Sequence, residues 1–154
     1  MPKRIDLTQV KVHKGSRYPA PFDEPCAARL RQRLGDAAEL SGFGVNLLRL
    51  PPGAWSSQRH WHSAEDEFIY VLEGEVVLVT DAGDEVLRPG GCAGFKAGDP
   101  DGHHLQNRSA RDAVVLEVGG RRPDGDAVDY SDIDMRVDQR GFTRKNGEPY
   151  PAKG

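Results

Sequence analysis

The stretch "RHWHSAEDEFIYVLEG", residues 59–74, combines two histidines one position apart, several acidic residues and a run of β-forming side chains. Side chains at positions i and i+2 of a strand point to the same face, so His60 and His62 project together while Trp61 points away. After the turn "SAED", a second strand is expected to begin at Glu67, and a hairpin would return that carboxylate to the histidines. Two imidazoles and a carboxylate suit a divalent transition metal such as Zn, Fe, Mn, Ni or Co.

A second polar segment, "GHHLQN" at residues 102–107, offers a further imidazole. If the segment is a strand, His103 and Leu105 share one face, and His104 and Gln106 share the other. Leu105 favours the interior and Gln106 favours water. Alternation therefore places His103 inward and His104 outward, although a bulge at the preceding glycine would reverse the two.

Short runs rich in Val, Ile, Leu, Phe and Tyr, separated by Gly, Pro, Asp and Asn, occupy residues 44–120. Short strands at this spacing, without helical segments between them, predict an all-β sandwich or barrel. Residues 1–21 favour an irregular arm or one edge strand, and residues 26–40 suit a short helix followed by an extended segment. The tail from residue 121 is acidic and punctuated by Gly and Pro, which indicates an extended, surface-lying segment that could add one strand.

The spacing of these residues resembles the first sequence motif of the cupin superfamily. That motif runs Gly, five residues, HxH, three or four residues, Glu, six residues, Gly. In this chain Gly53 is followed by six residues, His60, His62, four residues, Glu67, six residues and Gly74. Only the first gap departs, by one residue.

The second motif of the family runs Gly, five residues, PxG, two residues, His, three residues, Asn. Here Gly90 is followed by five residues, Lys96-Ala97-Gly98, four residues, His103, three residues and Asn107. Lys96 replaces the usual Pro, and the loop before the histidine is longer. The resemblance covers residues 44–118.

The resemblance implies a double-stranded β-helix, also called a jelly roll or cupin barrel, and commonly a homodimer. It divides the chain into an N-terminal arm (1–43), a barrel core (44–118) and a C-terminal extension packing on the barrel (119–154). It also implies a divalent metal held inside the barrel mouth by four side chains, namely His60, His62, Glu67 and His103.

Such a site leaves one or two positions of an octahedral metal open to a ligand. We therefore expect a metal-dependent enzyme acting on a small oxygenated metabolite, such as a sugar, a sugar phosphate or an organic acid, by isomerase, lyase or dioxygenase chemistry. The candidates for the general base are Gln58 and Tyr70. The alternative is a non-catalytic module that binds or senses a small molecule, because a fold alone does not decide function.

Other polar residues have simpler interpretations. Arg49, Gln58 and Arg59 lie near the expected mouth and could bind an anionic ligand, but solvation accounts for at least two of them. Asn107 is either an inward-facing group or a turn residue that satisfies backbone. The acidic stretch "DGDAVDYSDID", residues 124–134, lacks the spacing of a calcium loop and is expected to be solvated.

Composition limits the remaining possibilities. With a net charge of −3, 37% hydrophobic and 29% charged residues, the chain fits a globular domain, and nucleic acid is not an expected partner despite Arg29, Arg31 and Arg33. Neither a membrane span nor a signal peptide is evident, so a cytoplasmic location and no membrane partner are expected. Cys26 and Cys92 are expected to be reduced thiols, with Cys92 a small buried group.

Trp61, Phe68 and Tyr70 are large aromatic side chains that point away from the histidines in the predicted strands. Such residues pack an outer layer or a subunit interface more often than they line a ligand pocket. An exposed apolar sheet of this kind, together with the two arms, would supply a two-fold interface.

Overall fold

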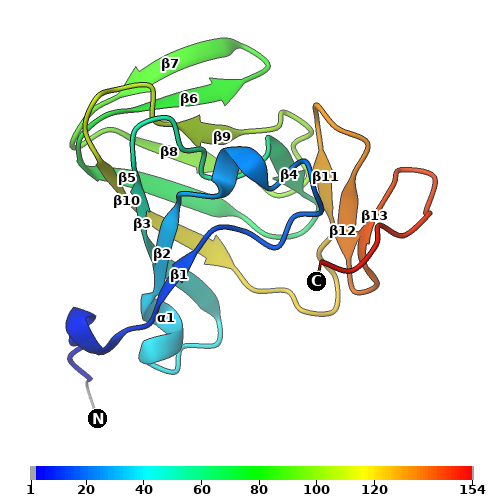
Figure 1. Cartoon of the computed structure of the whole chain (residues 1–154). Coiled ribbons are helices and arrows are strands. Elements are labelled where there is room, and N and C mark those ends of the chain that lie inside the picture. Colours follow the sequence, from blue (N-terminus) through cyan, green and yellow to red (C-terminus); the bar gives the residue numbers. More distant parts are fainter. Residues whose placement is uncertain (1–2, 154) are drawn as a thin grey trace.

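Three antiparallel sheets form almost all of the regular structure of the chain in the computed structural model (Figure 1). The structure describes residues 3–153, so the first two residues of the predicted N-terminal arm and the last of the C-terminal extension lie outside the described residues. The strands, in chain order, are β1 (Val12–Lys14), β2 (Leu30–Arg33), β3 (Phe43–Leu50), β4 (His60–His62), β5 (Glu67–Glu73), β6 (Val76–Thr80), β7 (Gly83–Leu87), β8 (Cys92–Phe95), β9 (His104–Gln106), β10 (Ala113–Gly120), β11 (Val128–Tyr130), β12 (Arg136–Asp138) and β13 (Gly141–Thr143).

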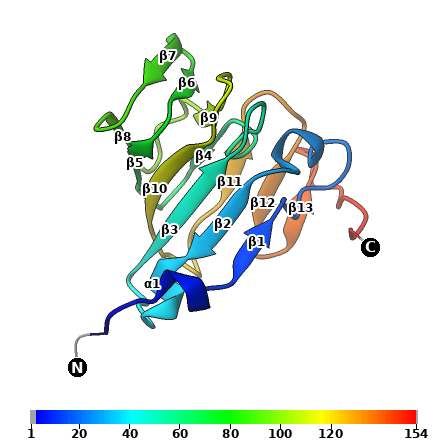
Figure 2. The ribbon, with the colours of Figure 1, turned by 60° about the vertical axis from the view of Figure 1, so that its left-hand side comes forward.

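The largest sheet has six strands in the order β1-β2-β3-β10-β5-β8, and Figure 2 shows β1, β2, β3 and β10 side by side. Strand β2 lies within the segment 26–40, where a helix followed by an extended segment was predicted. The order is the reverse: the strand comes first, and only the single turn α1 (Leu34–Ala37) follows. Pairing with β1 on one side and β3 on the other overrides the helix propensity of this segment.

A three-stranded sheet (β7-β6-β9) and a four-stranded sheet (β13-β12-β11-β4) complete the fold. An isolated antiparallel bridge between His60 and His103 connects them, because these residues exchange two backbone hydrogen bonds of 3.1 and 2.9 Å. The C-terminal extension thus adds three strands, β11 to β13, where one was expected. The first of them pairs with β4, which carries the two histidines of the HxH pair.

The main core fills the space between the six-stranded and three-stranded sheets. Its buried side chains come from alternating positions of facing strands, and each such Leu, Ile or Val contributes roughly 1.5–3 kcal/mol of transfer free energy. The members are Leu48, Leu50, Ala54, Ile69, Val71, Val76, Leu78, Leu105, Ala113 and Val115. This arrangement confirms the all-β double-stranded β-helix expected from the sequence.

A second buried cluster fastens the C-terminal extension to the N-terminal segment. Tyr18 and Tyr130 meet edge to face with ring centroids 5.5 Å apart, and Met135 and Cys26 are fully buried beside them. Cys26 is the last residue of the short 3-10 helix η2 (Glu24–Cys26). A second 3-10 helix, η1 (Leu7–Gln9), lies nearer the N-terminus.

Cys92 is exposed on β8, so the expectation that its thiol is buried was wrong.

None of the helices among residues 3–153 is long and apolar enough to span a membrane.

Candidate metal centre

Three imidazoles converge because of two backbone features. His60 and His62 are separated by one residue on β4 and therefore share a face. His103 lies directly opposite His60 in the antiparallel bridge, and residues opposite one another in such a pair project to the same face of the sheet. The bridge thus places His103, rather than its neighbour His104, beside the HxH pair.

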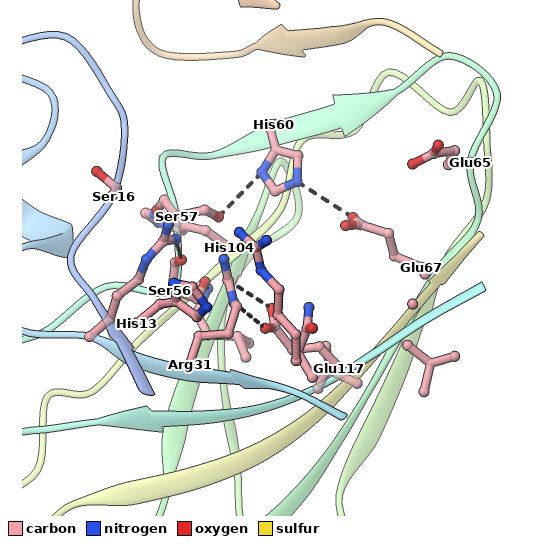
Figure 3. A pocket seen from close by; sticks show the side chains of 18 of the residues that line it. His13, Ser16, Arg31, Ser56, Ser57, His60, Glu65, Glu67, His104 and Glu117 are labelled. Carbon is pink, nitrogen blue, oxygen red and sulfur yellow. Dashed lines mark hydrogen bonds and ion pairs between the residues drawn. The ribbon is translucent and has the colours of Figure 1, made fainter. Parts of the chain in front are cut away.

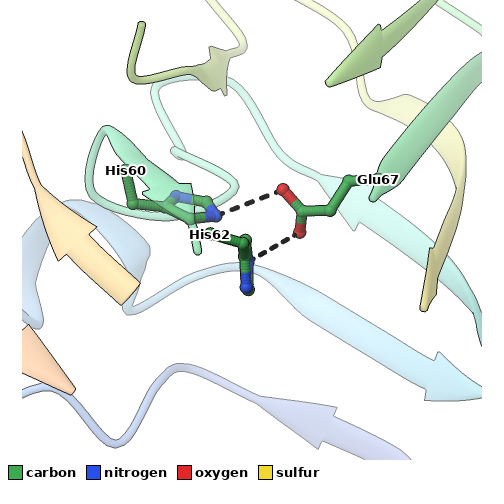
Figure 4. A group of neighbouring side chains, drawn as sticks. All are labelled: His60, His62 and Glu67. Atoms are coloured by element: carbon green, nitrogen blue, oxygen red, sulfur yellow. Dashed lines mark ion pairs between the residues drawn. The ribbon is translucent and has the colours of Figure 1, made fainter. Parts of the chain in front are cut away.

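The carboxylate comes from the facing sheet. Glu67 is the first residue of β5, which pairs with β10 and β8, whereas β4 pairs with β11. The predicted β4–β5 hairpin is therefore wrong, and residues 63–66 carry the chain from one sheet to the other. Glu67 nevertheless faces the imidazoles: its Oε2 lies 3.5 Å from His60 Nε2, and its Oε1 lies 3.1 Å from His62 Nε2 (Figure 4). The same Oε2 lies 2.5 Å from His103 Nε2.

The hydrogen bonds of the outer ring nitrogens test whether this group suits a metal. Nδ1 of His60 lies 2.9 Å from the carbonyl oxygen of Gln58, which can only accept, and Nδ1 of His62 lies 2.6 Å from a carboxylate oxygen of Asp126. Each Nδ1 therefore donates to an oxygen, which leaves Nε2 of both rings to face Glu67. In the metal-free cluster a proton can occupy these contacts between Nε2 and the carboxylate, and a divalent cation would take its place. The donor atoms of His60, His62 and Glu67 all lie within 4.8 Å of one another, so this group could hold a metal ion.

Titration of the metal-free cluster follows from the same contacts. Burial lowers the pKa of His62, but hydrogen bonds to Glu67 and Asp126 outweigh burial and raise that pKa to about 9. Burial raises the pKa of Glu67, yet its contacts with His103, His60 and His62 hold the pKa well below the usual value. At neutral pH a metal must therefore displace a proton from His62, whereas the carboxylate is already ionised.

His103 and His104 have different surroundings. The ring of His103 stacks on Phe95 with centroids 3.5 Å apart, and its Nδ1 is a buried atom without a hydrogen-bond partner in the described part of the chain. His104 is only 3% exposed, so the prediction that it faces water was wrong. Its Nδ1 lies 2.8 Å from the carbonyl oxygen of Ser57 and its ring packs edge to face on Trp55, which turns it away from Glu67.

Asp126 has a defined role that the sequence did not indicate. Its Oδ2 contacts His62 Nδ1, and its Oδ1 accepts hydrogen bonds from the backbone N–H groups of Ala64 and Glu65 at 3.0 and 3.2 Å. The carboxylate thereby orients the His62 ring and shapes the turn between β4 and β5. The expectation that the whole acidic stretch is solvated is wrong at this position.

A cavity of about 610 Å³ opens beside the cluster and extends to β1 and β2 (Figure 3). His60, Glu67 and His103 line one end, while Arg31 and Glu117 line the other. The side chains between them are mostly polar, which suits a small hydrophilic ligand. A second cavity of about 340 Å³ lies on the other side and shares Glu67 and His103 with the first, with His62 also in its wall.

The other residues proposed for the mouth serve the fold instead. Arg59 forms ion pairs with Asp132 and Asp81, and Arg49 pairs with Asp112. The Gln58 amide donates to the carbonyl of Phe22 at 2.8 Å, and Tyr70 is 38% exposed on the outer face of β5. The Asn107 amide donates to the carbonyls of Leu50 and Arg111, both at 2.7 Å. Asn107 is thus the turn residue of the two alternatives, and neither candidate general base faces the large cavity.

The arginines in and directly before β2 were not expected to face a ligand cavity. Arg29, Arg31 and Arg33 all line the large cavity. Their i, i+2, i+4 spacing in "RLRQR" is the period of a strand, and a strand assignment for this segment would have placed all three on one face.

The chain is thus a double-stranded β-helix that gathers three imidazoles and one carboxylate, a set of side chains that could hold a metal ion. The family model described as "Cupin domain" matches residues 46–119. The chain belongs to the cupin superfamily. No curated protein matches the chain.

Several solved structures resemble this chain over most of its length. A sugar phosphate isomerase from a cupin superfamily, from Silicibacter pomeroyi, is 47% identical, with 97% of this chain and 98% of that chain covered and a TM-score of 0.91. A putative sugar phosphate isomerase from Acidithiobacillus ferrooxidans is 29% identical, with coverages of 85% and 83% and a TM-score of 0.73. A polyketide cyclase from Streptomyces resistomycificus is 24% identical, with coverages of 86% and 87% and a TM-score of 0.67, and shares the fold.

Proposed function

We propose that this cupin is a metal-dependent enzyme that isomerises a small sugar-type metabolite, with His60, His62, Glu67 and His103 as the metal ligands. The observation that carries the proposal is that three members of this donor group, His60, Glu67 and His103, line a polar cavity large enough for such a molecule. The 47% identity to a protein named a sugar phosphate isomerase supports the reaction class. A bound divalent metal would polarise a carbonyl or hydroxyl group of the ligand.

The residues of the chain would contribute orientation and exclusion of water. Gln58 and Asp126 fix the rings of His60 and His62, so the donors are arranged before a metal arrives. Phe95 stacks on His103 and provides an apolar surface at the inner end of the cavity. A ligand in this cavity would therefore meet a rigid donor group on one side and polar side chains on the other.

The function is tested by metal reconstitution. We expect chelated protein, reloaded separately with Mn, Fe, Co, Ni or Zn, to interconvert an aldose and a ketose phosphate with at least one metal. Proton NMR in deuterated water would follow both turnover and solvent exchange at the reacting carbon, and the His60→Ala variant should show neither. Stoichiometric ligand binding without exchange, unchanged by chelation, would instead identify a binding or sensing module.

We also propose a homodimer that covers the outer face of the six-stranded sheet. Four large apolar side chains are exposed on this face: Val12 (52%), Phe68 (40%), Tyr70 (38%) and Leu72 (43%). Light scattering is expected to give twice the mass of one chain, and Phe68→Asp should shift the equilibrium to monomer. Val86→Asp, on the exposed β7 of another sheet, is the matched control and should not. A monomer mass for the unaltered protein would contradict the proposal.

A further inference from the structure

Three arginines line the large cavity along the wall that β2 forms. Arg31 and Arg33 belong to β2, Arg29 directly precedes it, and the two-residue period places all three toward the cavity. We call Arg29, Arg31 and Arg33 the arginine stripe. His13 on β1 is paired with Arg31 across the sheet and also lines the cavity (Figure 3).

Arg29 is a buried cation without a carboxylate partner. Arg29 is only 9% exposed. Its Nε donates to the carbonyl of Gly15 at 3.0 Å, and its Nη1 donates to the carbonyl of Ser56. No ion pair involves Arg29 among residues 3–153. Burying an unpaired charge costs several kcal/mol even after relaxation, so an anion in the cavity would relieve a real electrostatic penalty.

One carboxylate forms an ion pair with a member of the arginine stripe. Glu117 on β10 accepts hydrogen bonds from Arg31 Nε at 2.9 Å and Nη2 at 3.4 Å, which neutralises that guanidinium (Figure 3). Arg33 is exposed at the cavity edge and has no ion pair in the described part of the chain. Two of the three positive charges therefore remain without a counter-charge.

The charge of the whole cavity agrees with this local count. Six Lys or Arg residues line it against four Asp or Glu residues, although the chain as a whole is negative. One of those four acids is Glu67, which belongs to the candidate metal centre. The excess of positive charge thus comes mainly from β1, β2 and the residues next to them, which form one wall of the cavity.

We propose that the arginine stripe binds the phosphate group of a phosphate monoester whose carbonyl or hydroxyl end reaches the candidate metal centre. Two uncompensated guanidinium groups match the two negative charges of a phosphate monoester at neutral pH, and guanidinium N–H groups pair geometrically with phosphate oxygens. The second half of this statement rests on the proposed function. The phosphate subsite itself does not, because phosphate can be tested without metal or turnover.

The test measures binding of inorganic phosphate to the chelated, full-length protein by phosphorus NMR titration. We expect saturable binding to the unaltered protein, weakened about tenfold or more by Arg33→Gln and by Arg29→Gln, which corresponds to the loss of one charge-assisted hydrogen bond. Arg88→Gln is the matched control, because Arg88 is 71% exposed and pairs only with Glu75 among the described residues. Binding should also survive His60→Ala.

The outcomes separate the two proposals. Phosphate binding that survives His60→Ala while turnover disappears supports both the subsite and the metal-dependent reaction. Phosphate binding without turnover by any reloaded form overturns the reaction and leaves the subsite supported. Absence of saturable binding, equal affinity in Arg33→Gln, Arg29→Gln and unaltered protein, or acetate binding as tight as phosphate would overturn the phosphate subsite. Circular dichroism of each variant ensures that a loss of binding is not a loss of fold.

Discussion

Replacing Glu67 by Gln is expected to lower the affinity for a divalent transition metal by more than about a hundredfold and to abolish turnover. Gln keeps the size of the side chain but removes the negative charge that faces the Nε2 atoms of His60, His62 and His103. Elemental analysis of purified variants and competition with a chelator would measure the loss. Glu73→Gln, at the exposed far end of the same strand, is the control and should bind metal normally.

A graded response is expected at the residue that holds His62. Asp126→Asn preserves the shape of the side chain but weakens the 2.6 Å contact with His62 Nδ1, and losses of about 10- to 100-fold in metal affinity are typical for such orienting groups. Asp124→Asn, in an exposed position of the same stretch, should have no effect. Unchanged metal affinity in Asp126→Asn would mean that this carboxylate only shapes the turn at Ala64 and Glu65.

The local sequence pattern was sufficient to predict which histidines of the candidate metal centre face one another. Alternation along a strand places His60 with His62, and the apolar Leu105 correctly indicated which way His103 faces. The reason that Glu67 meets them was not predictable in the same way, since β5 lies in a different sheet from β4. The motif spacing predicted that Glu67 lies near the histidines. The explanation assumed for this, a hairpin of β4 and β5, was wrong.

Contacts between residues far apart in the chain account for what was missed. Asp126 reaches His62 because β11 pairs with β4, with Val128 opposite His62. That register depends on packing of the C-terminal extension through Tyr130 and Met135, which no local period indicates. The β2 arginines were hidden because Ala, Leu, Arg and Gln favour helices, until pairing with β1 and β3 decides otherwise.

Replacing Gly74 by Ala is expected to lower the free energy of unfolding by about 2–4 kcal/mol, of which the left-handed backbone alone accounts for about 1–2 kcal/mol. Gly74 follows β5 with φ of +70°, and a Cβ there would lie 2.4 Å from the carbonyl oxygen of Asp112 and 2.9 Å from the Cα of Ala113. Both neighbours are backbone atoms at the start of β10. Relief of the overlap would therefore have to shift a central strand of the six-stranded sheet.

Gly53→Ala separates the two contributions to that loss, because Gly53 has φ of +85° but no atom within 4 Å of the position that the alanine methyl group would occupy. It should lose only about 1 kcal/mol through backbone conformation. Thermal unfolding of the metal-free proteins would show the difference, at roughly 2–4 °C per kcal/mol for a chain of this size. Equal melting temperatures for Gly74→Ala and Gly53→Ala would mean that β10 can move away at little cost. In that case Gly74 would serve backbone conformation alone, and the close approach of the β5–β6 turn to β10 would not contribute to the requirement for glycine there.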